Sequence, residues 1–205
     1  MESGIQQLAE ADALLLQRAD AARTYGDDDR VPTIDEFVDF ACPDCSVFHA
    51  ERGDSLINRF VIGAGVNYRV RMYLIPRLMR GYQAAEAAYA AGALEGRSAF
   101  EGMMRLLLEH QEEWRYLLDP TPHFEEYARY LELPLDRFRE LLERDAMAPL
   151  ILSDIRMAQA MGVTGAPTFV FNRPGELTGE HSFYGNQPMS LFADYLERVG
   201  FPPPR

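Results

Sequence analysis

The stretch DFACPDCSVF, residues 39–48, contains both cysteines of the chain, Cys42 and Cys45. The residues that precede it belong to VPTIDEFVDF, residues 31–40, whose β-branched and aromatic side chains predict a strand. The apolar residues that follow the cysteines recur with a helical period and predict a helix over about residues 46–64. The cysteine pair therefore lies at a predicted strand-to-helix junction.

A cysteine at such a junction is placed near the N-cap of the helix. Pro43 then occupies the first helical position, where its missing N–H costs nothing. Unpaired backbone N–H groups and the helix dipole favour negative charge on the Cys42 sulfur. Such settings lower a thiol pKa from about 8.5 into the range of roughly 3.5 to 7.5. Cys45 lies on the same side of the helix and can close a short disulfide, so we expect Cys42 to attack and Cys45 to resolve the mixed disulfide.

Two other uses of a cysteine pair compete with this interpretation. A zinc site normally needs four protein ligands, and the chain has no second C-x-x-C. His49 could supply a third ligand, but we expect an ordinary histidine on the helix surface. A purely structural disulfide that closes so small a loop would add little stability. We therefore predict no metal and favour a redox pair.

The composition excludes several classes of protein. The 20 basic residues are all arginine and face 32 acidic ones, which gives a net charge of -12. This charge argues against nucleic acid and against anionic membrane surfaces as partners. Without lysine, neither Schiff-base nor phosphate-loop chemistry that needs a lysine is available. The longest apolar run near the start, residues 13–16, is too short for a signal-peptide core. We expect a cytoplasmic protein if Met1 is the native start, and an exported one if a signal peptide has been removed.

The remaining pattern predicts the order β-α-β, a block of helices, then α-β-β-α. VNYRVRMYLIP, residues 66–76, alternates apolar residues and predicts a second strand. Amphipathic segments separated by glycine and proline then predict the helical block. A helix over about 149–161, strands within 167–172 and 180–185, and a helix over 190–199 complete the order.

Together these features resemble the DsbA-like branch of the thioredoxin superfamily. The resemblance rests on IDEFVDFACPDC, on the downstream GVTGAPTFVFN and on the helical block between them, and it spans about residues 31–199. It implies an α/β protein with a thioredoxin-like fold and an inserted all-helical domain, and thiol–disulfide exchange as the activity. The expected parts are a helical or extended lead-in over 1–30, a thioredoxin-like domain from 31–77 and 146–205, and a helical insertion over 78–145.

The resemblance also implies roles for particular residues. Cys42 would be the nucleophile and Cys45 the resolving thiol, and no cofactor beyond their redox-active disulfide is expected. Pro167 would be the cis-proline that faces the pair. The loop before it would present backbone to an extended substrate peptide and shape the site through Thr164, Gly165 and Ala166. The expected partner is a thiol- or disulfide-containing protein or a small thiol, with the reducing or oxidising partner unknown.

Two carboxylates near the pair are candidates for tuning it. Glu36 matches the family's buried acid, which accepts the proton of the resolving cysteine; the alternative is an ordinary solvated carboxylate. Some relatives place a lysine beside this acid, so here water or an arginine would have to serve. Asp44 departs from the histidine or aromatic residue common in strongly oxidising members. Its charge near the Cys42 sulfur disfavours the thiolate. With Pro43 it is expected to tune the pair toward a moderate or reducing potential.

Three functions remain open at the level of sequence. The first is a dithiol oxidoreductase that uses the C-P-D-C pair. The second is a glutathione-using transferase or isomerase of the related DsbA-like kind, which generally lacks a second cysteine. The third is a redox-inactive binding module on the same fold, which an intact C-x-x-C disfavours.

Overall fold

The computed structural model describes residues 2–201, with side chains from residue 10 onward. A five-stranded sheet with the order β1-β3-β2-β4-β5 lies at the centre of the molecule. Its strands are β1 (Thr24–Tyr25), β2 (Thr33–Val38), β3 (Asn67–Met72), β4 (Thr168–Asn172) and β5 (Ser182–Tyr184). The central strand β2 runs parallel to β3 and antiparallel to β4. Four of these strands confirm predictions from the sequence, whereas β1 lies where only a polar break was expected.

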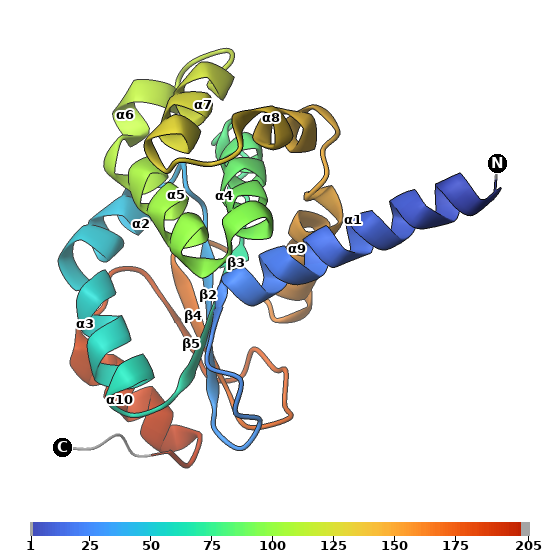
Figure 1. The fold of residues 1–205 in the computed structure, drawn as a ribbon. Helices are drawn as coiled ribbons and strands as arrows, with labels where there is room; N and C mark the ends of the chain where they lie inside the picture. Colours follow the sequence, from blue (N-terminus) through green and yellow to red (C-terminus); the bar gives the residue numbers. More distant parts are fainter. Residues whose placement is uncertain (1, 202–205) are drawn as a thin grey trace.

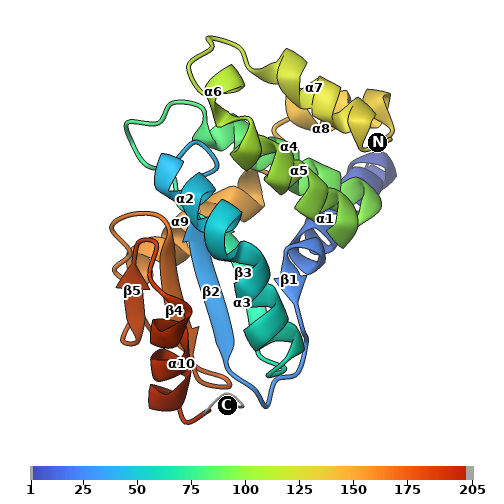
Figure 2. The same cartoon turned by 90° about the vertical axis from the view of Figure 1, so that its left-hand side faces the viewer.

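Helices cover both faces of the sheet (Figures 1 and 2). One face carries α10 (Met189–Arg198) and a helical segment that begins at the cysteines. That segment consists of α2 (Pro43–Phe48), η1 (His49–Gly53), α3 (Asp54–Leu56) and η2 (Ile57–Ile62), where η1 and η2 are π-helical turns. The other face carries α9 (Ala148–Ala160), which packs on Phe37 and Val170. Because side chains alternate along a strand, Glu36 and Phe169 point to the cysteine-bearing face.

The helical block packs around one alanine-rich helix, α4 (Gly81–Glu95). Seven of its alanines are fully buried, and their small side chains let neighbouring helices approach closely. At Gly92, a Cβ would lie 2.8 Å from the Cβ of Ala22, so the contact with the first helix requires glycine. Around α4 lie α1 (Glu2–Ala22), α5 (Arg97–Glu109), α6 (Gln111–Trp114), α7 (Thr121–Tyr130) and α8 (Leu135–Glu143). Residues 78–145, all of which are described, contain helices and no strand. The domain bounds given from the sequence also include residues 1 and 202–205, which lie outside the described residues.

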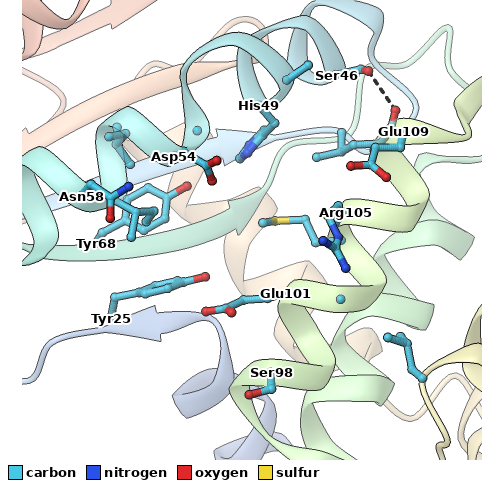
Figure 3. A pocket seen from close by; sticks show the side chains of 18 residues that line it. Tyr25, Ser46, His49, Asp54, Asn58, Tyr68, Ser98, Glu101, Arg105 and Glu109 are labelled. Atoms are coloured by element: carbon cyan, nitrogen blue, oxygen red, sulfur yellow. Dashed lines mark hydrogen bonds between the residues drawn. The ribbon is translucent and has the colours of Figure 1, made fainter.

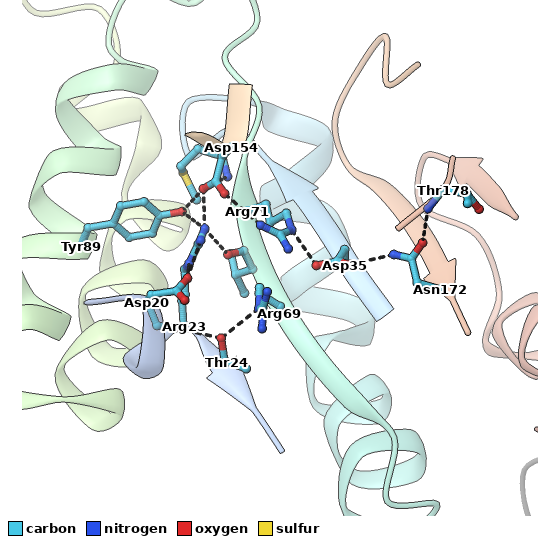
Figure 4. Close-up of polar contacts among 12 residues, drawn as sticks. Asp20, Arg23, Thr24, Asp35, Arg69, Arg71, Tyr89, Asp154, Asn172 and Thr178 are labelled. Carbon is cyan, nitrogen blue, oxygen red and sulfur yellow. Dashed lines mark hydrogen bonds and ion pairs between the residues drawn. The ribbon is translucent and has the colours of Figure 1, made fainter. Parts of the chain in front are cut away.

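A buried network of charges, which we call the Asp154 network, ties α1, α9 and the sheet together (Figure 4). The carboxylate of Asp154, which is fully buried, pairs with Arg23 and with Arg71. It also accepts hydrogen bonds from the Tyr89 hydroxyl at 2.6 Å and from the Met72 backbone N–H at 3.0 Å. Arg71 continues the network to Asp35, with Nε 2.6 Å from the carboxylate. Arg23 follows α1, so the end of this helix is part of the packed body.

Candidate active site

Cys42 and Cys45 are placed as the sequence predicts. Cys42 is the N-cap residue with an extended backbone, φ -82° and ψ 122°, and Pro43 begins helix α2. Both cysteines are free thiols and buried, with 4% of Cys42 and none of Cys45 exposed. The Cys45 thiol donates a hydrogen bond to the Cys42 sulfur. The two sulfurs therefore face each other at the start of the helix.

The surroundings separate the acidities of the two thiols. The hydrogen bond from the Cys45 thiol, together with backbone N–H groups of Cys45 and Asp44, lowers the pKa of Cys42 to about 7, against the opposing effect of burial. Burial, followed by the hydrogen bond to Cys42, raises the pKa of Cys45 well above its ordinary value. Cys42 therefore ionises at a lower pH than Cys45, whose thiol stays protonated near neutral pH.

The loop before β4 faces the Cys42 sulfur. The Ala166–Pro167 peptide bond is cis. The Cys42 thiol donates to the Ala166 carbonyl oxygen across 3.4 Å. Thr164, at the start of the same loop, is exposed. The structure thus brings Ala166 and Pro167 to Cys42 and leaves Thr164 on the surface.

Tyr184 of β5 borders this loop, and no local pattern in the sequence points to it. A Cβ on Gly165 would lie 2.7 Å from a carbon of the Tyr184 ring, so the ring can lie here only against a glycine. Tyr184 is 55% exposed. Burial, and after it the negative charge of Asp44 and then of Cys42, raises the pKa of the Tyr184 hydroxyl. An exposed aromatic side chain therefore lies beside the cysteine pair.

Glu36 is the buried acid of the site and not a solvated carboxylate. It is fully buried, and its Oε1 lies 2.9 Å from Nε2 of His49, while Tyr68 donates its hydroxyl hydrogen to Oε2. The side chains that accompany this acid in the structure are a histidine and a tyrosine, where the sequence had suggested water or an arginine. His49 is accordingly not an ordinary surface histidine, because its ring turns toward the sheet. The charge of Glu36 contributes to the raised pKa of Cys45, which places the acid near the resolving thiol.

Asp39, the last residue before the loop to Cys42, is a second buried acid that sequence reasoning missed. Its carboxylate is fully buried and accepts backbone N–H groups of Ala41 at 2.9 Å and Ile75 at 2.8 Å. Burial raises its pKa to about 6, opposed by these two hydrogen bonds. Its charge raises the pKa of Cys42. Near neutral pH, Asp39 therefore opposes thiolate formation at the nucleophile.

Replacing Asp39 with asparagine should lower the pKa of Cys42 below its value of about 7. Removal of one nearby charge shifts a thiol pKa by roughly 0.5–1 unit. The effect should be present only above about pH 6, where the Asp39 carboxylate is ionised. The pH dependence of thiolate absorbance in the ultraviolet measures this pKa. Asp29→Asn, a change at an exposed aspartate in the loop before β2, serves as the control. An unchanged Cys42 pKa in Asp39→Asn would remove Asp39 from the tuning of the pair.

Gln111 connects the helical block to the cysteine loop. Its side-chain amide donates to the Phe40 carbonyl at 2.6 Å and to the Cys42 carbonyl at 2.9 Å, and it is buried. It begins α6 within the polar run EHQEEW, where nothing in the sequence distinguishes it from its neighbours. These hydrogen bonds fix the backbone of Cys42 to the helical block.

The part of the chain that the structure describes contains no group of three or more His, Cys, Asp or Glu side chains that could hold a metal ion. His49, the one candidate third ligand beside the pair, is engaged with Glu36.

A cysteine pair at a strand-to-helix junction, facing a cis-proline loop across the end of the sheet, defines a protein of the thioredoxin-fold class with a redox-type motif. The family model described as Thioredoxin matches residues 18–179. The chain belongs to the thioredoxin family.

Solved structures of DsbA-like proteins share the fold. α-DsbA1 of Wolbachia pipientis superposes with a TM-score of 0.72 at 19% identity, covering 86% of this chain and 89% of that one. BdbD of Bacillus subtilis gives 0.72 at 18% identity, with 86% and 91% covered. A thioredoxin-like oxidoreductase from Silicibacter pomeroyi DSS-3 gives 0.66 at 21% identity, with 91% and 96% covered. These likenesses confirm the predicted α/β fold, thioredoxin-like with helices inserted as in DsbA.

Two curated relatives are more similar in sequence. The Na(+)/H(+) antiporter NhaA 3 of Salinispora tropica is 33% identical over 140 residues, which cover 68% of this chain and 20% of the antiporter. The antiporter NhaA 1 of Salinispora arenicola is 37% identical over 142 residues, with the same coverage. The chain thus spans about a fifth of the length of these relatives. Among residues 2–201, no helix has both the length and the apolar character needed to cross a bilayer.

Proposed function

We propose that the chain is a thiol–disulfide oxidoreductase that exchanges disulfides with protein or small-thiol substrates through its Cys-Pro-Asp-Cys pair. The observation that carries the proposal is the contrast between two facing thiols. The pKa of Cys42 is lowered to about 7 and that of Cys45 is raised well above its ordinary value. A thiolate is the attacking species in disulfide exchange, so this contrast supports attack by Cys42 followed by resolution by Cys45.

In the reducing direction, the Cys42 thiolate attacks one sulfur of a substrate disulfide. The substrate S–S bond breaks, a mixed disulfide forms at Cys42, and the first substrate thiolate leaves and takes up a proton. Cys45 then gives its proton to Glu36 and attacks the Cys42 sulfur. The second substrate thiolate leaves, the Cys42–Cys45 disulfide forms, and two electrons have passed to the substrate. The reverse sequence oxidises a substrate dithiol.

The loop at Ala166 and Pro167 supports recognition of an extended substrate segment. The Ala166 carbonyl already accepts a hydrogen bond from the Cys42 thiol, so backbone placed beside it lies next to the reacting sulfur. Adding a short strand to a protein's backbone is a general mode of peptide binding. Ala166 itself is fully buried, so the substrate would meet the loop first at its exposed part, Thr164. The exposed ring of Tyr184 beside the loop offers apolar surface for a substrate side chain.

The two alternative functions fit the site less well. A glutathione-using transferase or isomerase needs one reactive thiol, yet Cys45 is fully buried and hydrogen-bonded to Cys42, as a resolving thiol would be. A redox-inactive binding module gains nothing from lowering the pKa of Cys42. Glutathione-dependent activity that survives Cys45→Ser would favour the first alternative.

Turnover of insulin disulfides in the presence of a reductant tests the proposal directly. Equilibration with glutathione buffers, followed by thiol counting, gives the reduction potential of the pair. The proposal requires both insulin reduction and a reversible loss of two free thiols. A protein whose two thiols never form a disulfide across the range of buffers would not be a dithiol oxidoreductase.

Replacing Asp44 with histidine should lower the pKa of Cys42 and raise the reduction potential by roughly a few tens of millivolts, since one pK unit corresponds to about 30 mV for a two-electron couple. The carboxylate disfavours the thiolate, and whatever disfavours the reduced form favours the disulfide. The effect should be present only at pH values where the thiolate is populated. Glutathione equilibration measures it, with Asp136→His as the control because Asp136 is exposed on α8 of the helical block. An unchanged or lowered potential in Asp44→His would show that Asp44 does not set it.

A further inference from the structure

A cavity of about 850 Å³ lies between the helical segment from α2 to η2 and helix α5 (Figure 3). The side chain of His49 lines it, together with polar groups from the strands and from both helical walls. Ser46, on the turn that follows the cysteines, donates to the Leu108 carbonyl at 2.8 Å and joins the two walls at one end. The cavity thus adjoins the helix that carries the cysteines.

The His49 ring spans the distance between this cavity and the buried acid. Its Nε2 lies 2.9 Å from the Glu36 carboxylate, which has no exposed surface. Its Nδ1 lies on the Gly53 side, where a Cβ would come within 3.3 Å of it, and Gly53 also lines the cavity. One ring nitrogen therefore meets the acid and the other lies on the side of Gly53, at the wall of the cavity.

A buried acid that accepts a proton must also lose it. The partner Tyr68 cannot carry that proton, because burial and then the Glu36 charge raise the pKa of its hydroxyl well above the ordinary value. Tyr68 serves instead as a fixed hydrogen-bond donor to the carboxylate. An imidazole can both accept and release a proton near neutral pH. Of the two side chains that form hydrogen bonds with Glu36 in the described part of the chain, His49 alone suits proton transfer.

We propose that His49 is a positioning residue that passes the Glu36 proton to water in this cavity, an inference that rests on the proposed function. When Cys45 is deprotonated, the Glu36 carboxyl gives its proton to Nε2, and Nδ1 releases a proton to cavity water. When Cys45 regains its proton in the opposite half-reaction, Nδ1 takes a proton from water and Nε2 returns one to Glu36. Each half-reaction restores the imidazole to the tautomer that the other requires.

The ionisable groups around His49 come from the sheet and from both helical walls of the cavity. Glu36 and Tyr68 contact or adjoin it from the sheet, together with Tyr25 of β1. The helical walls of the cavity contribute the carboxylates of Asp54, Glu101 and Glu109 and the guanidinium of Arg105 (Figure 3). Carboxylates therefore outnumber cations among the side chains that line the cavity around the ring.

His49→Gln tests the proposal, because glutamine keeps a hydrogen-bonding group near Glu36 but cannot carry a proton. An aromatic disulfide that releases two coloured thiols in succession separates attack by Cys42 from resolution by Cys45. We expect the resolution step to slow roughly tenfold. This loss is smaller than that usual on removal of a side chain that acts directly as a general acid or base, because His49 acts through Glu36. The pH–rate profile of that step should lose one of its pH-dependent limbs. The first release, measured alone in a Cys45→Ser background, should be unchanged.

His110→Gln is the matched control, since His110 also lies 2.9 Å from a glutamate, Glu113, but on an exposed surface. It should leave both steps unchanged. In His49→Ala, free imidazole should enter the cavity and restore resolution, whereas pyrazole, of similar shape but far weaker basicity, should not. Equal rates and identical pH profiles in His49→Gln and wild type would overturn the relay while leaving the oxidoreductase intact. Slow resolution that imidazole fails to restore would also overturn it. Absence of the first thiol release in wild type would instead refute the proposed function.

Discussion

Cys42→Ser should abolish the reduction of insulin disulfides, with turnover no faster than the reaction without protein. A serine hydroxyl cannot form a disulfide, so the first covalent step is lost and not merely slowed. Serine differs from cysteine by a single atom, so the fold should persist. The melting temperature of the variant checks this. The rate of insulin precipitation in the presence of dithiothreitol measures the activity.

Cys45→Ser should behave differently, and this difference distinguishes a nucleophile from a resolving thiol. Cys42 keeps its backbone hydrogen bonds, so attack continues, but the mixed disulfide now persists. Mass spectrometry should find this variant joined covalently to substrate or to glutathione, an adduct that a reducing agent removes. If Cys42→Ser formed the adducts and Cys45→Ser did not, the two roles would be reversed. Insulin reduction by Cys42→Ser at the wild-type rate would show that the pair is not the reactive centre.

The features that could be predicted correctly from the sequence are set by residues that lie close together along the chain. The strand–Cys-Pro–helix order at Cys42 follows from residue types within one short stretch, and helix α2 begins at Pro43 as expected. The strands β3 and β4 are recognisable from β-branched and aromatic residues alone. Recognition of GVTGAPT as a partner of the cysteines required a family resemblance, because nothing local to Pro167 shows that it meets a residue more than 100 positions earlier.

The features that could not be predicted from the sequence depend on the register of the strands and on tertiary packing. Tyr68 reaches Glu36 because β3 lies parallel to β2, with Glu36 opposite Val70, two residues beyond Tyr68. His49 turns inward because its helix lies across the same face of the sheet. Asp39 resembles any acidic residue at the end of a strand until the structure shows its carboxylate enclosed, so close to Gly81 that a Cβ added there would lie 2.4 Å from Oδ1. In each case the local pattern is common and only the tertiary partner gives it a role.

The Asp154 network likewise depends on residues that are far apart in sequence, and Asp154→Ala should be strongly destabilising. The change leaves the guanidinium groups of Arg23 and Arg71 buried without their shared carboxylate, since these side chains are only 2% and 6% exposed. Removal of one partner from a buried ion pair typically costs about 3–5 kcal/mol. Arg23 keeps Asp20 and Arg71 keeps Asp35, so we expect the lower end of that range. The midpoint of urea unfolding measures the loss.

Two further variants separate the loss of a buried charge from a general effect of substitution. Asp154→Asn keeps an acceptor for the Tyr89 hydroxyl and should lose less stability than Asp154→Ala. Glu176→Ala breaks an ion pair with Arg173 in which both side chains are more than 40% exposed, and should change stability by less than about 0.5 kcal/mol. If Asp154→Ala unfolded at the same urea concentration as Glu176→Ala, the network would contribute nothing to stability.

Helix α9, which carries Asp154, leads directly into the loop that places Ala166 against Cys42. Loosening that anchor should therefore reduce disulfide exchange in the fraction of protein that remains folded.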